Sequence, residues 1–84
     1  MNREELLKVY YQSLNIFKNK KPRGLGYIRT EATKLLGMID LLLFADVVCE
    51  SWYNHQYDLI LEIQDKKDDE WDEIEDEVIR AKRR

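Results

Sequence analysis

The fold is decided by residues 35–49, LLGMIDLLLFADVVC, which form the longest apolar stretch of the chain. Together with the residues before it, this stretch places apolar side chains at the three- and four-residue spacing of a helix: Ile28, Ala32, Leu35, Leu36, Ile39, Leu42 and Leu43. Past residue 40 the polar face largely disappears, because further apolar side chains surround the helix: Leu41, Phe44, Val47 and Val48. A helix that is apolar on nearly every side lies at the centre of a fold or is covered by a second chain.

The stretch is too short to span a membrane, and Asp40 and Asp46 interrupt it. We therefore expect a central helix over residues 27–52 in a protein that does not enter a membrane. A bend near residues 51–55 is expected to separate it from a further amphipathic helix over residues 55–67. One unbroken helix through both segments is the alternative, which is ordinary in a dimer of extended helices.

The residues before the central helix form an amphipathic helix and a loop. Residues 2–18 place Leu6, Tyr10 and Phe17 near one line, and Asn2 with Glu5 resembles a capping box. Proline and glycine are concentrated in residues 19–26, which we expect to form a basic loop.

The C-terminal segment changes from acidic to basic. Residues 65–77 contain nine acidic and two basic side chains, and the chain ends with four basic residues among its last seven. Over residues 68–84 a narrow apolar stripe recurs at helical spacing: Trp71, Ile74, Val78 and Ala81. We expect a C-terminal helix that docks weakly, frays, or becomes ordered only on a partner.

These elements predict an all-α fold: one small domain, residues 1–84, that is a bundle of three to four helices. A chain of 84 residues has a marginal core, which small domains support with disulfides, metals or self-association. The single cysteine, Cys49, excludes an internal disulfide. With the single histidine, His55, the chain also cannot supply the four Cys and His ligands of the usual zinc sites. We therefore expect homodimerisation to complete the bundle. No signal-peptide pattern follows the N-terminus, and we expect a cytoplasmic protein.

Catalytic motifs are absent from the sequence. Cys49 and His55 are six residues apart and would not meet on one helix, and no phosphate-binding glycine motif occurs. Four acids at helical spacing can bind a divalent cation in principle, but we interpret them as a solvated stripe: Asp46, Glu50, Asp58 and Glu62. The paired-glutamate motif of helical nucleotide pyrophosphatases is absent from the central helix. We expect no enzyme, no catalytic residue, no metal and no cofactor.

The remaining features favour an inhibitor or adaptor that binds a protein partner. An acidic helix with one large aromatic residue suits a basic protein surface, and tryptophan is enriched at binding hot spots. The expected contact residues lie on the C-terminal helix and around the end of the central one: Trp71, Asp69, Glu70, Asp72, Glu73, Phe44, Trp52 and Tyr53. Size, charge distribution and missing catalytic motifs are typical of small accessory proteins of phages and mobile elements.

The alternative is binding of nucleic acid or nucleotide phosphate through the basic loop, residues 18–29. Glycines let backbone amides approach a phosphate, and four basic side chains supply charge: Lys20, Lys21, Arg23 and Arg29. The isoelectric point near 5.1 disfavours a dedicated DNA-binding protein, which is usually basic.

Overall fold

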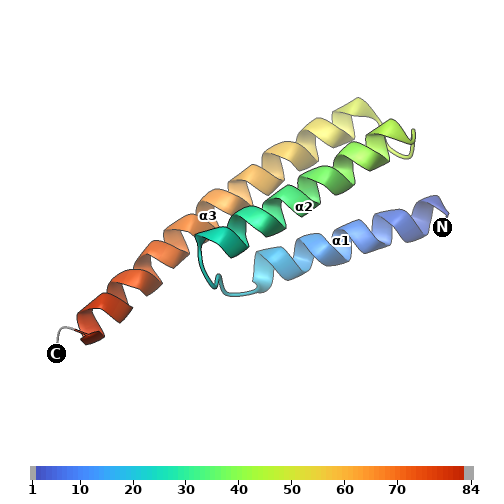
Figure 1. The fold of residues 1–84 in the computed structure, drawn as a ribbon. Helices are drawn as coiled ribbons and strands as arrows, with labels where there is room; N and C mark the ends of the chain where they lie inside the picture. The colour runs from blue at the N-terminus through green and yellow to red at the C-terminus, as the bar shows by residue number, and fades with distance from the viewer. Residues whose placement is uncertain (1, 83–84) are drawn as a thin grey trace.

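The computed structural model describes residues 2–82 of the chain and contains three helices within them (Figure 1). Helix α1 spans Arg3–Asn19, α2 spans Leu25–Phe44 and α3 spans Glu50–Lys82. No strand occurs in this range, which confirms the all-α prediction. Residues 83 and 84, which the predicted C-terminal helix included, lie outside the described range. No helix in residues 2–82 has the length and apolar character needed to cross a bilayer.

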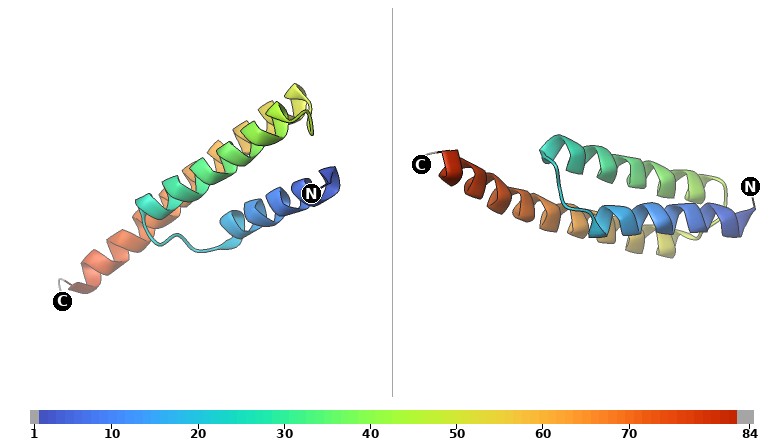
Figure 2. Two further views of the ribbon diagram at one scale, coloured as in Figure 1. Left: turned by 45° about the vertical axis from the view of Figure 1, so that its right-hand side comes forward. Right: turned by 90° about the horizontal axis from the view of Figure 1, so that it is seen from below.

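The molecule is a rod of 55 × 21 × 16 Å because α3 runs along its whole length. Its 33 residues correspond to roughly 50 Å of helix. Helix α2 packs antiparallel against the first part of α3, and α1 lies beside this pair (Figures 1 and 2). The C-terminal part of α3 extends beyond both of the other helices (Figure 2).

The start of α1 follows the sequence prediction. Asn2 accepts a hydrogen bond of 2.9 Å from the backbone amide of Glu5 through its side-chain oxygen, and thereby satisfies one free amide of the first turn. Glu4 and Glu5 lie at the positive end of the helix dipole, and Lys18 lies at the negative end.

The predicted central helix, residues 27–52, is wrong at its C-terminal end, because α2 stops at Phe44. Asp46 adopts the left-handed conformation (φ 57°), its amide bonds to Leu43, and the Val47 amide bonds to Leu42. These two bonds form a Schellman motif, in which the residue after the helix cap takes the left-handed conformation. Asp tolerates this conformation better than most residues, so the helix ends without the glycine that usually marks such a site.

The predicted bend near residues 51–55 and the division between helices 55–67 and 68–84 are also wrong, because α3 is continuous. No proline or glycine follows Gly37 in the sequence. Asn54 and His55 lie on the exposed side of α3, where their side chains do not compete with the backbone hydrogen bonds. The only turn between the two long helices is therefore the one at residues 45–49.

The core lies between the three helices and takes side chains from all of them: Tyr10, Leu14, Phe17, Ile28, Ala32, Leu35, Ile39, Leu42, Ile60 and Ile63. One buried polar contact crosses it, in which the Tyr10 hydroxyl donates a 2.8 Å hydrogen bond to Oε1 of Gln56. Since both groups would be unsatisfied if α1 shifted along α3, this bond fixes the register of the two helices.

Candidate interaction surfaces

Helix α3 leaves the bundle just after Lys67 and Asp68. The buried Lys67 side chain donates a 2.8 Å hydrogen bond from Nζ to the backbone carbonyl of Lys20, and Asp68 forms a 2.9 Å ion pair with Arg29. The first contact ties α3 to the loop between α1 and α2, and the second ties it to the beginning of α2. We call the part of α3 beyond them, residues 69–82, the arm.

The arm is strongly acidic. It bears seven carboxylates and two basic side chains, Arg80 and Lys82, and every one of these charged side chains is exposed. Like charges one helical turn apart repel each other, and the arm has no other helix beside it to compensate (Figure 1). A cationic surface would therefore stabilise the arm.

An apolar stripe runs along one side of the arm. Trp71 and Ile74 are half-buried at its base, Val78 is 48% exposed, and Ala81 is exposed near its end. Their spacing continues the side of α3 that faces the core through Ile60 and Ile63. The core-facing side of α3 thus continues for about two turns beyond Ile74 with nothing packed on it.

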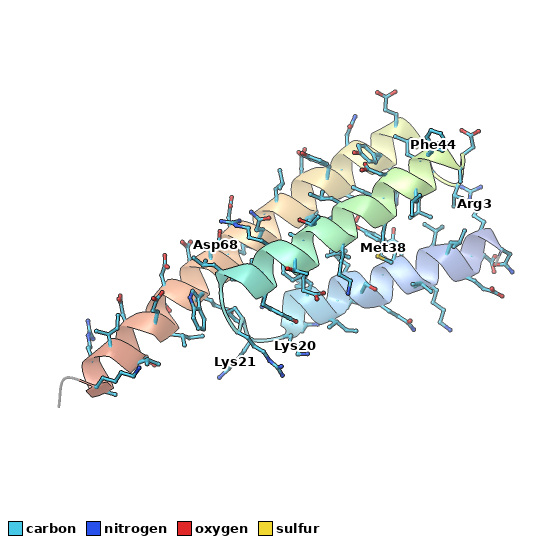
Figure 3. All side chains as sticks on the ribbon, viewed as in Figure 1. Arg3, Lys20, Lys21, Met38, Phe44 and Asp68 are labelled. Atoms are coloured by element: carbon cyan, nitrogen blue, oxygen red, sulfur yellow. The ribbon has the colours of Figure 1, made fainter. Side chains whose placement is uncertain are left out.

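The predicted partner-binding residues fall into three places. Five of them lie together on the first turn of the arm: Asp69, Glu70, Trp71, Asp72 and Glu73. Phe44 is 91% exposed and lies at the opposite end of the bundle (Figure 3). Trp52 and Tyr53, at the start of α3, are half-buried.

Trp52 and Tyr53 are engaged in contacts within the chain. Nε1 of Trp52 donates a 3.0 Å hydrogen bond to the Tyr11 hydroxyl, and its ring packs edge-on against Tyr10, with 5.4 Å between centroids. The Tyr53 hydroxyl donates a 2.6 Å hydrogen bond to Asp40, which raises the pKa of Tyr53 above its ordinary value. These side chains hold the first turns of α3 against α1 and α2.

The four residues of the alternative phosphate site are not free to act together. Arg29 is paired with Asp68, and Nζ of Lys20 lies 5.9 Å from the centre of the Tyr27 ring. Lys21 and Arg23 are exposed, and within residues 2–82 neither forms an ion pair. Of these four residues, Lys21 and Arg23 are thus left for an anionic ligand, and Figure 3 labels Lys21 beside the engaged Lys20.

A groove that the sequence did not reveal opens between α1 and α2 at the end of the bundle far from the arm. Its volume is about 290 Å³, and its lining is apolar: Leu6, Val9, Tyr10, Met38, Leu41, Leu42, Ala45 and Val47. The polar end of Tyr10 is bonded to Gln56, and burial raises the pKa of this hydroxyl well above its ordinary value. The sequence signal was the excess of apolar residues after Asp40, but it could not say which of them remain exposed.

No cluster of three or more His, Cys, Asp or Glu side chains suited to a metal ion occurs among residues 2–82. Asp46 lies in the turn after α2, whereas Glu50, Asp58 and Glu62 lie on α3, so the four acids do not share one helix. Cys49 is exposed in the same turn, and His55 is exposed on α3.

No protein-family model matches the chain, and comparisons with curated proteins and with solved structures find no match either.

Proposed function

We propose that this protein is a small interaction module, acting as an inhibitor or adaptor, whose arm binds a basic surface of a protein partner. The observation that supports this most strongly is that α3 continues for about three turns past the helices that cover it. Over those turns it keeps its core-facing apolar stripe between exposed carboxylates. An amphipathic helix of this kind is recognised by an apolar groove with cationic edges.

Trp71 is the expected anchor of this contact. It is half-buried at the base of the arm, where it packs against the edge of the core. A partner that covers the exposed part of its ring would gain apolar contact area without ordering a flexible side chain. The neighbouring carboxylates would set orientation and association rate more than affinity: Asp69, Glu70, Asp72 and Glu73.

Self-association and a cytoplasmic location belong to the same proposal. The single cysteine, Cys49, is free and exposed, which suits a reducing compartment. Phage or mobile-element proteins that redirect a host protein remain the class that we propose for it. The alternative, phosphate binding by Lys20, Lys21, Arg23 and Arg29, has weaker support because Arg29 and Lys20 have contacts within the chain.

The test is affinity capture from native cytoplasm with the full chain as bait. Charge reversal on the arm, Glu73→Lys with Asp76→Lys, should abolish recovery of the specific partner, and Trp71→Ala should reduce it strongly. The matched control is Asp58→Lys with Asp65→Lys, which makes the same change of charge at exposed positions of α3 within the bundle. The control should retain the partner.

Two results would overturn the proposal. One is a partner that is recovered equally well with the arm variant and with the control variant. The other is a captured ligand that is nucleic acid, released steeply by salt and lost in Lys21→Glu with Arg23→Glu, since that pattern belongs to phosphate binding.

A further inference from the structure

We infer that a second copy of this chain covers the apolar surface formed by the outer side of α2 and the α1–α2 groove. This surface, which we call the α2 face, contains the most exposed large apolar side chains of the bundle. Phe44 is 91% exposed and Leu41 is 71% exposed. On α1, Val9 lines the groove and is 41% exposed, and Ile16, which lies beside Met38 and Lys34 farther along the same two helices, is 57% exposed. The inference specifies the interface of the self-association proposed above and does not depend on what the arm binds.

One exposed stripe of α2 carries no charge, and the exposed charged residues of the helix, Arg29, Lys34 and Asp40, lie on either side of it. Successive exposed positions at helical spacing are Gly26, Thr30, Thr33, Gly37, Leu41 and Phe44. Charged residues make up 37% of the chain, and both α1 and α3 present many of them to solvent. Depletion of charge is what distinguishes the centre of an interface from the rest of a protein surface.

Gly37 provides a second indication on the same face. It lies in the interior of α2, where glycine is less favourable than alanine, and its backbone angles do not require glycine. A β-carbon at this position would meet nothing within 4 Å in the chain. Packing within one copy therefore gives no reason for a glycine, whereas close approach of a helix from a second copy does.

The area available matches what a dimer requires. With roughly 150–200 Å² for each large side chain, the exposed fractions of Phe44, Leu41, Ile16 and Val9 amount to about 400 Å². A standard interface buries about 800 Å² on each partner, of which about 60% is apolar. The α2 face supplies most of that apolar share before its glycines and threonines are counted.

The shape of the face points to a second copy as the occupant. Phe44 projects from the end of α2, and Leu41, one turn before it, lines the groove together with Met38 and Ala45, so a protruding ring lies next to a hollow without charged groups. Figure 3 labels Phe44 and Met38 on α2. A two-fold dimer pairs the same patch on both copies, and each copy can then place an apolar side chain in the hollow of the other. The uncharged stripe of α2 would then be buried without an unpaired ion.

Sedimentation equilibrium of the full chain over a range of concentrations tests this inference. The unmodified chain should have the mass of two copies at high concentration. Gly37→Glu should weaken dimerisation by roughly tenfold or more, because it places a bulky charged side chain in the uncharged face that the second copy would cover. Its helix content should not fall, since glutamate favours helices and the site is open. Asn15→Glu, which adds the same charge at an exposed position of α1, should leave the dimer intact.

A second variant, Leu41→Gln with Phe44→Gln, changes two exposed side chains and should also give monomers with unchanged circular dichroism. The inference is overturned if the unmodified chain has the mass of one copy at every concentration. It is also overturned if both α2-face variants stay dimeric, or if the Trp71→Ala chain alone becomes monomeric, because the interface would then lie on the arm.

Discussion

Nζ of Lys67 on α3 donates a 2.8 Å hydrogen bond to the backbone carbonyl oxygen of Lys20, and the Lys67 side chain is almost fully buried. Lys20 is the residue at which the chain leaves α1. The bond therefore joins α3 to the loop two residues before the arm begins, and it marks where the bundle ends. Glu70 lies 3.7 Å from the same ammonium group and partly balances its charge.

Replacing Lys67 with alanine should destabilise the bundle by about 1.5–3 kcal/mol, because a charge-assisted hydrogen bond and the packing of the aliphatic stem are both lost. Urea unfolding followed by circular dichroism measures this change. Lys66→Ala is the matched control, since Lys66 is 76% exposed and pairs only loosely with Glu62. It should change stability by less than about 0.5 kcal/mol. Equal effects of the two substitutions would show that Lys67 has no structural role.

Tyr10→Phe should cost about 1–3 kcal/mol, because it leaves the buried Gln56 side chain without its hydrogen-bond partner. Adding Gln56→Leu should recover part of this loss, since the double variant leaves no unsatisfied group at the site. A double-mutant cycle by chemical denaturation gives the coupling energy. A coupling energy near zero would mean that the bond does not hold α1 in register with α3.

The stability of the chain should fall with rising pH above about 10 in a way that depends on Tyr10. Burial raises the pKa of Tyr10 above its ordinary value of 10.0, with a contribution from Tyr11, so the folded state keeps a proton that the unfolded state releases. Above pH 10 the unfolding free energy should therefore decrease by up to about 1.4 kcal/mol per pH unit from this group. In Tyr10→Phe this part of the slope should disappear. An unchanged slope would contradict the burial of the hydroxyl.

Asp46→Gly should stabilise the chain by up to about 1 kcal/mol, because glycine adopts the left-handed conformation at Asp46 (φ 57°) without steric cost. Asp46→Val should be destabilising at the same site, since β-branched residues rarely adopt this conformation. In thermal unfolding, the melting temperature should be highest for the glycine variant, intermediate for the unmodified chain with aspartate, and lowest for the valine variant. A valine variant as stable as the glycine variant would mean that α2 does not end in this conformation.

The sequence predicted those features that depend on local patterns. The spacing of Leu35, Ile39 and Leu42 predicted the buried side of α2, and Asn2 predicted the start of α1; both predictions are confirmed. The arm residues from Asp69 to Glu73 lie together because they are neighbours on one helix.

Other features depend on tertiary structure, which local patterns do not encode. The end of α2 at Phe44 rests on a left-handed aspartate in a segment that looked helical and apolar. Lys67 lies in an acidic stretch of the sequence, which gives no sign of burial, yet it is buried because the loop carbonyl of Lys20 is its partner. The groove beside Leu41 exists because α1 and α2 leave part of each other uncovered.

The most direct test of the central claim is hydrogen–deuterium exchange along α3, measured on the isolated chain and on the complex recovered by affinity capture. In the isolated chain, amides of the arm should exchange far faster than those around Ile60 and Ile63, which are buried against α2. In the complex, the arm from Trp71 to Lys82 should become protected while the bundle changes little. An arm that is as protected as the core when alone, or that stays unprotected in the complex, would contradict the claim that it is the binding element.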